Sequence, residues 1–369
     1  MPFLHKDTIV KVEIWPVLVP TTTPFVVATG RLDQTHNLFV RVTLYSGTWG
    51  IGEIAPFPDI TGEEVSSSLA VAKDLAKHLL GEPVSCFRKI SRLLAEMAPT
   101  FPAARCGLET AVVDALCREA GIPLWALWGG ADVRKRETDI TIPICDLEQT
   151  LALAQHWRSQ GFQIFKLKVG KNLEEDIQRI EALHQHFPTV RFILDANQGF
   201  KEDDVLRLMK SLHLIQDHIM LLEQPIHKDD SAGMVSLRQS LQIPIAADES
   251  VSTLEEAQAV IRQGAADFIN IKITKSGLIQ GLDIATLART SGIPLMIGGM
   301  LETRIAMGCS WSLVLGLGGF EILDLDTPLL LSKDPVSGGY KYSGPFLQTW
   351  DEPGLAMDSP TTSAVHVIE

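Results

Sequence analysis

The sequence predicts a (β/α)8 barrel, a modified TIM barrel, preceded by an α+β capping domain. After residue 136 a short apolar run recurs about every 25 residues, and an amphipathic helical segment separates each run from the next. The runs are almost continuously apolar, which is typical of parallel strands buried on both faces. The predicted strands are residues 140–144, 164–169, 191–196, 219–224, 243–248, 268–272, 294–299 and 320–326.

The N-terminal third of the chain has a different pattern. Apolar and polar residues alternate over residues 9–18 and 38–54, which predicts two stretches of strand. Residues 63–128 carry Ala and Leu at spacings of three and four, which predicts helices. The polar, turn-rich segment 21–35 between the strands is predicted to be a mobile loop.

The change of pattern near residue 131 divides the chain. We expect residues 1–130, completed by 345–369, to form the capping domain, and residues 131–344 to form the barrel. A doubly wound open sheet would need a glycine-rich turn after its first strand, and none follows residues 140–144. The glycine cluster at 316–319 precedes a strand instead, so the barrel is preferred.

Composition limits the kinds of partner. A net charge of -13 argues against nucleic acid or a membrane surface, because both attract concentrated Lys and Arg. Cys occurs 5 times without a CxxC pair, which indicates reduced thiols. Charges near the start argue against a signal peptide, and no run approaches the ~20 apolar residues of a membrane helix. We therefore expect a cytoplasmic homo-oligomer that acts on a small molecule.

Charged residues end five consecutive strands of the predicted barrel. Parallel barrels build their active sites at the C-terminal ends of the strands, so these side chains should face one mouth. A single charged strand end often only caps a helix, whereas five in succession predict an active site. In order along the chain they are Lys168, Asp195, Glu223, Asp248 and Lys272.

The three acids in the middle of this series predict a metal site. Asp195, Glu223 and Asp248 lie on adjacent strands, and an all-oxygen set of carboxylates suits Mg²⁺, with Mn²⁺ as a possible substitute. Neither His nor Cys occupies these positions, which disfavours zinc. Three separate helix caps or surface ion pairs are the alternative, but carboxylates that converge without a cation would repel one another.

The lysines predict proton transfer at carbon. Lys166 and Lys168 share one face of the second strand, and Lys272 ends the sixth, which lies opposite in a closed barrel. A substrate carbon above the metal would then have an amine on each side, so removing a proton from one face and returning one to the other inverts it. Burial and a nearby cation lower the pKa of an amine, so a neutral lysine base is within reach. Lys166 is expected to favour this neutral form by like charge and to contact the substrate carboxylate.

At these residues the chain resembles the enolase superfamily and, within it, the muconate-lactonising-enzyme subgroup, over nearly its whole length. The resemblance implies an isomerase in which Lys168 and Lys272 carry out a 1,1-proton transfer through an enediolate intermediate. The mandelate-racemase branch is less similar, because it places a catalytic His on strand seven, where this chain is apolar. The matching motifs are Lys166-Leu167-Lys168, Asp195-Ala196-Asn197, Glu223-Gln224-Pro225, Asp248-Glu249-Ser250 and Lys272, so that Asn197 and Glu249 are expected beside the metal ligands.

The last strand gives the clue to the substrate. Asp324 and Asp326 are two apart, and an Asp-x-Asp here resembles the dipeptide epimerases of the L-Ala-D/L-Glu type, whose two acids hold the α-ammonium group. Two carboxylates in a barrel mouth that excludes water need a cation as a charge partner. One of them could instead cap the following turn. The spacing of Thr141 matches that of a substrate-contacting threonine in these enzymes. We expect Gly298 to contact the substrate as well. Glu302, after strand seven, is expected either to steer a substrate side chain or to close an ion pair.

The side-chain preference stays open. In the Ala-Glu epimerases an Arg near position 31 binds the glutamate carboxylate, but here Arg31 comes one residue late and Gly30 takes the matching place. An apolar substrate side chain is the alternative, and Phe25, Phe57 and Ile60 would suit it.

Three functions are therefore weighed. The first is a Mg²⁺-dependent dipeptide epimerase that inverts the α-carbon of the C-terminal residue. The second is an N-succinylamino acid racemase, an o-succinylbenzoate synthase or a muconate cycloisomerase-type lyase on the same scaffold. The third, a non-enzymatic binder of an amino compound, would have no reason to keep two buried amines near a metal.

Overall fold

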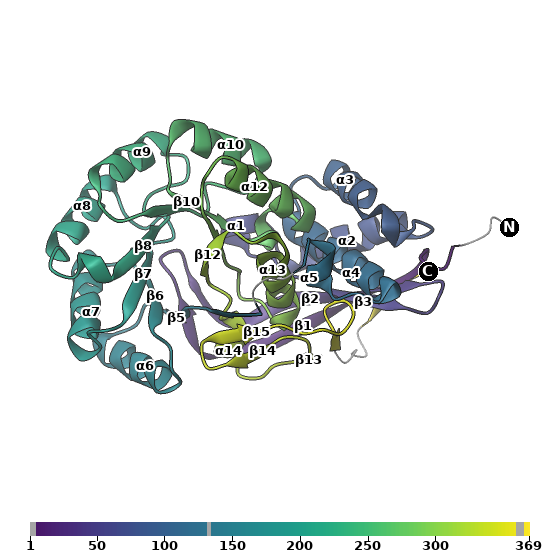
Figure 1. The fold of residues 1–369 in the computed structure, drawn as a ribbon, viewed down its shortest axis with the longest axis horizontal. Helices are drawn as coiled ribbons and strands as arrows, with labels where there is room; N and C mark the ends of the chain where they lie inside the picture. Colours follow the sequence, from purple (N-terminus) through teal and green to yellow (C-terminus); the bar gives the residue numbers. More distant parts are fainter. Residues whose placement is uncertain (1–4, 131–133, 359–364) are drawn as a thin grey trace.

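The computed structural model describes residues 5–130, 134–358 and 365–369. An N-terminal α+β domain and a strand-and-helix barrel lie side by side, with the long strands β1 and β2 of the former reaching across to the latter (Figure 1). None of the helices in the described ranges combines the length and the apolar character that crossing a bilayer requires.

The N-terminal domain is built on a four-stranded antiparallel sheet in the order β17-β1-β2-β3. The helices α2 and α4 pack against it, with α3 packed on them, and α4 approaches β3 so closely that glycine is required. A Cβ atom on Gly52 would lie 1.9 Å from the backbone oxygen of Gly107. The elements are β1 (Ile9–Val26), β2 (Arg31–Leu44), β3 (Trp49–Ile54), β17 (His366–Ile368), α1 (Pro58–Thr61), α2 (Val65–Leu79), η1 (Val84–Cys86), α3 (Phe87–Met97), α4 (Pro102–Ala120) and α5 (Leu124–Leu127).

The segment predicted to be a loop is mostly strand. β1 continues to Val26 and β2 begins at Arg31, and they pair as Phe25 with Leu32 beyond an irregularity that starts at Pro20. β-branched residues such as those at 21–23 favour the extended backbone even where the surface is polar, which is why the loop prediction was wrong. The hairpin reaches the barrel, where Ile144 N donates to Val26 O at 2.9 Å.

The barrel has the eight predicted parallel strands, in chain order around the sheet. Each is a little shorter than its apolar run; Lys168, Asp195 and Glu223 are the last residues of their strands, whereas Asp248 and Lys272 belong to the loops that form the mouth. The predicted fold class is confirmed. The strands are β5 (Ile140–Ile142), β6 (Ile164–Lys168), β7 (Arg191–Asp195), β8 (Ile219–Glu223), β9 (Ile245–Ala247), β10 (Phe268–Ile271), β11 (Leu295–Ile297) and β12 (Phe320–Leu323).

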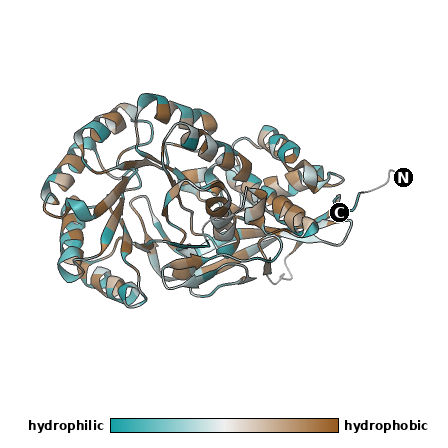
Figure 2. Cartoon of the chain, in the orientation of Figure 1, coloured by the Kyte–Doolittle hydropathy of each residue, from teal (hydrophilic) through white to brown (hydrophobic). Residues whose placement is uncertain are grey.

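Helices surround these strands with their apolar faces inward, as the hydropathy colouring shows (Figure 2). Inside the barrel a separate apolar cluster, from Ile164 on β6 to Ile322 on β12, fills the interior. This packing leaves the C-terminal end of the strands as the place for a site. The helices are α6 (Leu147–Ser159), α7 (Leu173–His186), α8 (Glu202–Ser211), η2 (Gln216–His218), α9 (Ser231–Ser240), α10 (Leu254–Gln263), α11 (Ile273–Ser276), α12 (Leu278–Thr290), α13 (Arg304–Leu317) and α14 (Thr327–Leu330).

Single hydrogen bonds, rather than a strand ladder, join the first and last barrel strands. Asp139 N donates to Leu323 O at 3.0 Å, and the Thr138 hydroxyl donates to the same oxygen at 3.1 Å. After the barrel the chain forms β13 (Ser337–Gly338), β14 (Lys341–Ser343), β15 (Phe346–Gln348) and β16 (Met357–Asp358). β15 pairs with β14 and with β4 (Lys135–Glu137), and β17 alone among these late strands joins β1. The boundaries at 130 and 345 stay a prediction.

Candidate active site

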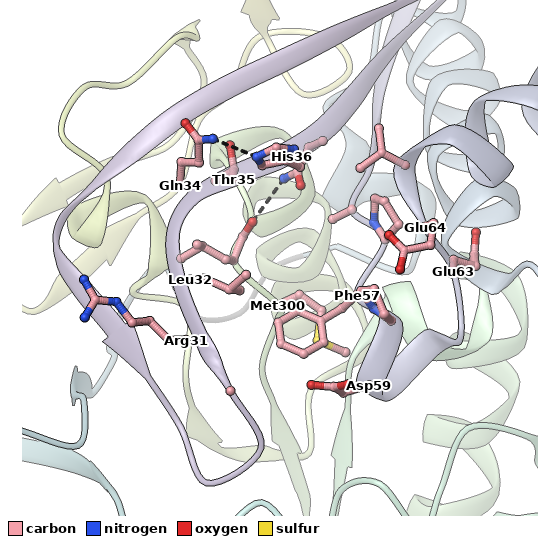
Figure 3. Close-up of a pocket in the computed structure, with 17 residues that line it drawn as sticks. Arg31, Leu32, Gln34, Thr35, His36, Phe57, Asp59, Glu63, Glu64 and Met300 are labelled. Atoms are coloured by element: carbon pink, nitrogen blue, oxygen red, sulfur yellow. Dashed lines mark hydrogen bonds between the residues drawn. The ribbon is translucent and has the colours of Figure 1, made fainter.

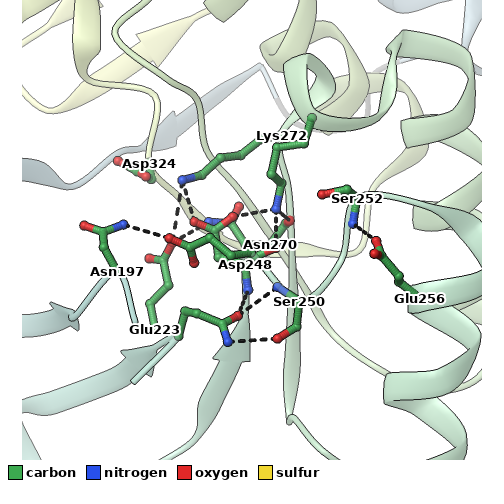
Figure 4. Close-up of polar contacts among 12 residues, drawn as sticks. Asn197, Glu223, Asp248, Ser250, Ser252, Glu256, Asn270, Lys272 and Asp324 are labelled. Atoms are coloured by element: carbon green, nitrogen blue, oxygen red, sulfur yellow. Dashed lines mark hydrogen bonds and ion pairs between the residues drawn. The ribbon is translucent and has the colours of Figure 1, made fainter. Parts of the chain in front are cut away.

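The five charged strand ends are brought together. Lys168, Asp195 and Glu223 end adjacent strands in register, while Asp248 and Lys272 each follow their strand directly. All five side chains are buried. Figure 4 shows how the carboxylates of Glu223 and Asp248 and the Lys272 amine converge from neighbouring strands.

Amines tie the three predicted metal ligands to one another. Lys166 Nζ lies 3.0 Å from Asp195 Oδ2 and 2.8 Å from Glu223 Oε2. Lys168 Nζ donates to Asp195 Oδ2 at 2.6 Å, and Lys272 Nζ donates to an oxygen of Asp248 at 2.6 Å. Each ligand of the predicted site therefore contacts at least one lysine.

These contacts set the pKa values of two amines. Burial lowers the pKa of Lys272, but the Asp248 carboxylate and its acidic neighbours outweigh burial and raise it above the ordinary value. The pKa of Lys166 is raised in the same way, against burial, by Asp195, Asp324 and Glu223. The lowered amine pKa expected from the sequence depends on the cation and stays a prediction; without the cation, carboxylates raise the pKa values of Lys166 and Lys272.

Carboxyl groups outnumber amines around the mouth, and this fits a cation. Burial, followed by the neighbouring acids, raises the pKa of Glu223 to about 8 and that of Glu249 to about 7, so these groups hold protons in the absence of further positive charge. A divalent cation on the strand-end carboxylates would supply that charge. The buried acids are Asp139, Asp195, Glu223, Asp248, Glu249, Asp324 and Asp326, against the buried amines of Lys166, Lys168, Lys272 and Lys275.

Lys275 was not predicted. It lies on α11, three residues after Lys272, and its buried amine donates to Asp248 Oδ1 and to Asp248 O, both at 2.5 Å, and to Asn270 O at 3.3 Å. All three of its hydrogens are used, so it holds Asp248 in place rather than moving protons. The only signal for Lys275 in the sequence was its position three residues after Lys272, which places both lysines on the same side of a helical turn.

The two residues predicted beside the ligands lie where expected. Asn197 Oδ1 accepts from Lys168 Nζ at 3.2 Å, and its amide nitrogen donates to Glu249 Oε1 at 3.2 Å. Asn270, which was not predicted, donates to Glu223 Oε1 at 2.8 Å. These bonds orient the Lys168 amine and the Glu223 carboxylate.

The acids of the last strand form a second cluster. Asp324 Oδ2 accepts from Lys166 Nζ at 2.6 Å, and Asp326 Oδ2 accepts from Thr141 N at 2.6 Å. Asp139, missed in the sequence although it shares a face with Thr141, brings a third carboxylate, and oxygens of the three acids lie within 4.8 Å of one another. Both oxygens of Asp139 lack a hydrogen-bond partner among the described residues, although the side chain is 1% exposed. Burial and the two neighbouring acids raise its pKa well above the usual range.

Gly298 lies at the centre of the site. A Cβ atom there would be 2.8 Å from Asp324 Oδ2 and 3.2 Å from the Lys272 side chain, so a larger residue would displace the Asp324 carboxylate. Glu302 is buried and accepts from the Thr274 hydroxyl at 2.6 Å and from Met300 N at 3.0 Å. It therefore supports the loop after β11 through hydrogen bonds.

Arg31 does not reach the lysines. Its side chain is 60% exposed and pairs with Asp33 Oδ1 at 3.0 Å. Figure 3 shows its guanidinium group pointing away from Phe57 and Met300. The cavity at the lysines is lined instead by Phe25, Val27, Thr29, Phe57, Ile60, Thr141, Lys168, Asn197, Lys272, Gly299, Met300, Leu301, Asp324 and Thr327.

Comparison with known families agrees with this geometry. Residues 9–129 match the N-terminal domain of the mandelate racemase/muconate lactonizing enzyme family, and residues 149–360 match the enolase C-terminal domain-like family. The chain belongs to the mandelate racemase/muconate lactonizing enzyme family. Its resemblance to the enolase superfamily is thereby confirmed.

Relatives within the family include named epimerases. An L-Ala-D/L-amino acid epimerase of Populus trichocarpa is 41% identical over 94% of this chain and 83% of its own length. An aromatic dipeptide epimerase of Herpetosiphon aurantiacus is 37% identical over 95% of this chain and 99% of its own length. The crystal structure of a dipeptide epimerase of Cytophaga hutchinsonii, complexed with Mg and the dipeptide D-Ala-L-Val, superimposes with a TM-score of 0.93 at 29% identity, covering 98% of this chain and 99% of that one.

Proposed function

We propose that this protein is a Mg²⁺-dependent dipeptide epimerase, an isomerase that inverts the α-carbon of the C-terminal residue of a dipeptide. The observation that carries the proposal is the placement of Lys168 at the end of β6 and Lys272 after β10. These two strands lie opposite each other in the barrel, and both amines line the same cavity. Relatives that are named dipeptide epimerases support it.

Asp195, Glu223 and Asp248 would hold the metal ion, which when bound supplies positive charge beside the substrate carboxylate. One lysine, Lys168 or Lys272, removes the α-proton from its face of the substrate. The other lysine returns a proton to the opposite face, and the configuration is inverted. Lys166, between the metal ligands and Asp324, binds the substrate carboxylate.

The cluster of Asp139, Asp324 and Asp326 would receive the substrate's α-ammonium group. Asp324 lines the cavity, whereas Asp326 is fully buried behind it on Thr141 N, so Asp324 makes the direct contact. An N-succinylamino acid has no free α-ammonium group and gains nothing from such a cluster. The cluster therefore favours a dipeptide over the substrates of the racemase and synthase alternatives.

The function is tested by exchange of the α-proton. A mixture of L,L-dipeptides, incubated with the protein and Mg²⁺ in D₂O, should gain one deuterium at the α-carbon of the C-terminal residue, read by mass spectrometry. Exchange in N-succinylamino acids together with none in any dipeptide would contradict the proposal and favour the racemase branch.

The double variant Asp324→Asn, Asp326→Asn should lose about 100-fold or more in kcat/KM for dipeptides, because the charge-assisted contact of Asp324 to the ammonium group and the negative charge of Asp326 behind it are both removed. Any residual exchange of N-acylated amino acids should fall much less. The measurement is α-proton exchange with both substrate classes. Asp283→Asn, at an exposed acid paired with Arg88, is the matched control. Equal losses for both classes would indicate a structural role.

Removal of the metal should abolish activity. Treatment with EDTA is expected to stop α-proton exchange, and added Mg²⁺ or Mn²⁺ should restore it, because hard cations suit an all-oxygen site. Zn²⁺ is expected to restore less. Undiminished exchange in EDTA would contradict the assignment of the three strand-end acids.

The homo-oligomeric assembly and the cytoplasmic location predicted from the sequence stay predictions. Size-exclusion chromatography with light scattering would test the first.

A further inference from the structure

The cavity at the lysines is too small for a dipeptide. Its volume is about 40 Å³, whereas pockets that enclose small ligands measure roughly 300–1,000 Å³. The β1–β2 hairpin covers it, and the Phe25 ring lies 5.9 Å from Lys168 Nζ. A substrate must therefore use additional space next to this cavity.

The reacting carbon dictates where that space lies. Its hydrogen must point at one lysine, its carboxylate at the metal ligands, and its amide nitrogen toward Asp324 on the last strand. The fourth substituent, the substrate side chain, must therefore point toward the remaining wall of the cavity. This wall is apolar and consists of Phe25, Val27, Phe57, Ile60, Met300 and Leu301.

A second cavity of about 280 Å³ lies under the hairpin. It shares Phe57, Met300 and Leu301 with the lysine cavity, so these three side chains form a partition between the two. On its other side Leu32 faces Phe57 and Met300, as Figure 3 shows. A side chain that passes the partition thus meets apolar side chains, and polar and charged residues line the rest of this cavity.

The charged residues of the second cavity do not favour a substrate carboxylate. Asp59, Glu63 and Glu64 are acidic, and Arg31, its one arginine among the described lining residues, is paired with Asp33. The Glu63 carboxylate is occupied by the Ser68 hydroxyl and by the backbone N–H groups of residues 103 and 104. It is therefore unavailable to bind a substrate ammonium group.

We propose that the epimerised residue carries an apolar side chain, and that this side chain passes Phe57 and Met300 into the cavity under the β1–β2 hairpin. This inference rests on the proposed dipeptide epimerase function and names its substrate class. The partition formed by Phe57, Met300 and Leu301 is the size filter. It sets how large a side chain the enzyme accepts.

The experiment measures α-proton exchange in D₂O for the series L-Ala-L-X, with X as Val, Leu, Phe, Trp, Glu and Lys. We expect kcat/KM for Leu and Phe to exceed that for Glu and Lys by about 10-fold or more, because each charged side chain must pass the apolar partition. Behind it, the arginine is already paired with Asp33 and the Glu63 carboxylate is already occupied. A preference for Glu that is lost in Arg31→Ala would overturn the inference, and so would a preference for Lys. Either result would leave the epimerase function intact.

Phe57→Ala tests the route. Removing the ring should join the two cavities and raise the ratio of kcat/KM for X as Trp over X as Val by about 10-fold. Met300→Ala offers a second opening of the same partition. Tyr45→Ala, at an aromatic residue that is 60% exposed and lines neither cavity, is the matched control. An unchanged ratio in both partition variants would refute the route, whereas no exchange with any dipeptide would refute the proposed function itself.

Discussion

Replacing Lys168 by alanine should lower the rate of epimerisation by about 10³-fold or more, because a positioned general base contributes about 10²–10⁴. Lys166, the other amine on β6, is held by Asp195, Glu223 and Asp324 and is not free to replace it. Loss of exchange should be one-sided. The diastereomer whose α-proton faces Lys272 should still exchange it with D₂O, while the other diastereomer should not. Lys272→Ala should show the opposite pattern. The measurement is deuterium incorporation from each pure diastereomer, followed separately.

The matched control for both variants is Lys210→Ala, at an exposed lysine on α8. It should exchange both diastereomers at the wild-type rate. Two-base transfer would be contradicted if Lys168→Ala still converted both diastereomers at rates near that of the wild type. Equal loss of both exchange reactions in each variant would indicate that the lysines hold the site together instead of acting on opposite faces.

The fold and the five strand-end residues could be predicted because both follow from a repeating local pattern. An apolar run that ends in a charged residue fixes the strand, its direction and the edge on which the charge lies. Lys168, Asp195 and Glu223 even lie in register, because neighbouring parallel strands of similar length end together.

Other features depend on contacts between distant segments, and the sequence carries little signal for them. Asp139 precedes its strand and meets Asp324 only because the first and last strands close the barrel. The direction of the Arg31 side chain depends on its pairing with Asp33 in a hairpin that was predicted to be a loop. The raised pKa of Lys272 likewise requires knowing that Asp248 and its acidic neighbours surround it.

Replacing Asp248 by asparagine should have the largest effect on stability among changes at the site. Its carboxylate accepts from Lys272 at one oxygen and from Lys275 at the other, and both amines are buried. The amide has the same shape but no charge, so two buried ammonium groups would lose their counter-ion. Breaking a buried ion pair costs about 3–5 kcal/mol, and we expect the free energy of unfolding, measured by urea denaturation, to fall by that amount.

The response of the melting temperature to Mg²⁺ distinguishes the loss of the Asp248 charge from a general loss of packing. A ligand that binds only the folded state raises its stability by RT ln(1 + [L]/Kd), so added Mg²⁺ should raise the melting temperature of the wild type but not that of Asp248→Asn. Asp283→Asn removes an exposed acid paired with Arg88 and should cost less than about 1 kcal/mol while keeping the response to Mg²⁺. Adding Lys275→Met to Asp248→Asn should restore part of the lost stability, because one of the two unpaired charges is then gone. An Asp248→Asn protein as stable and as responsive to Mg²⁺ as Asp283→Asn would show that Asp248 neither neutralises the two lysines nor binds the metal.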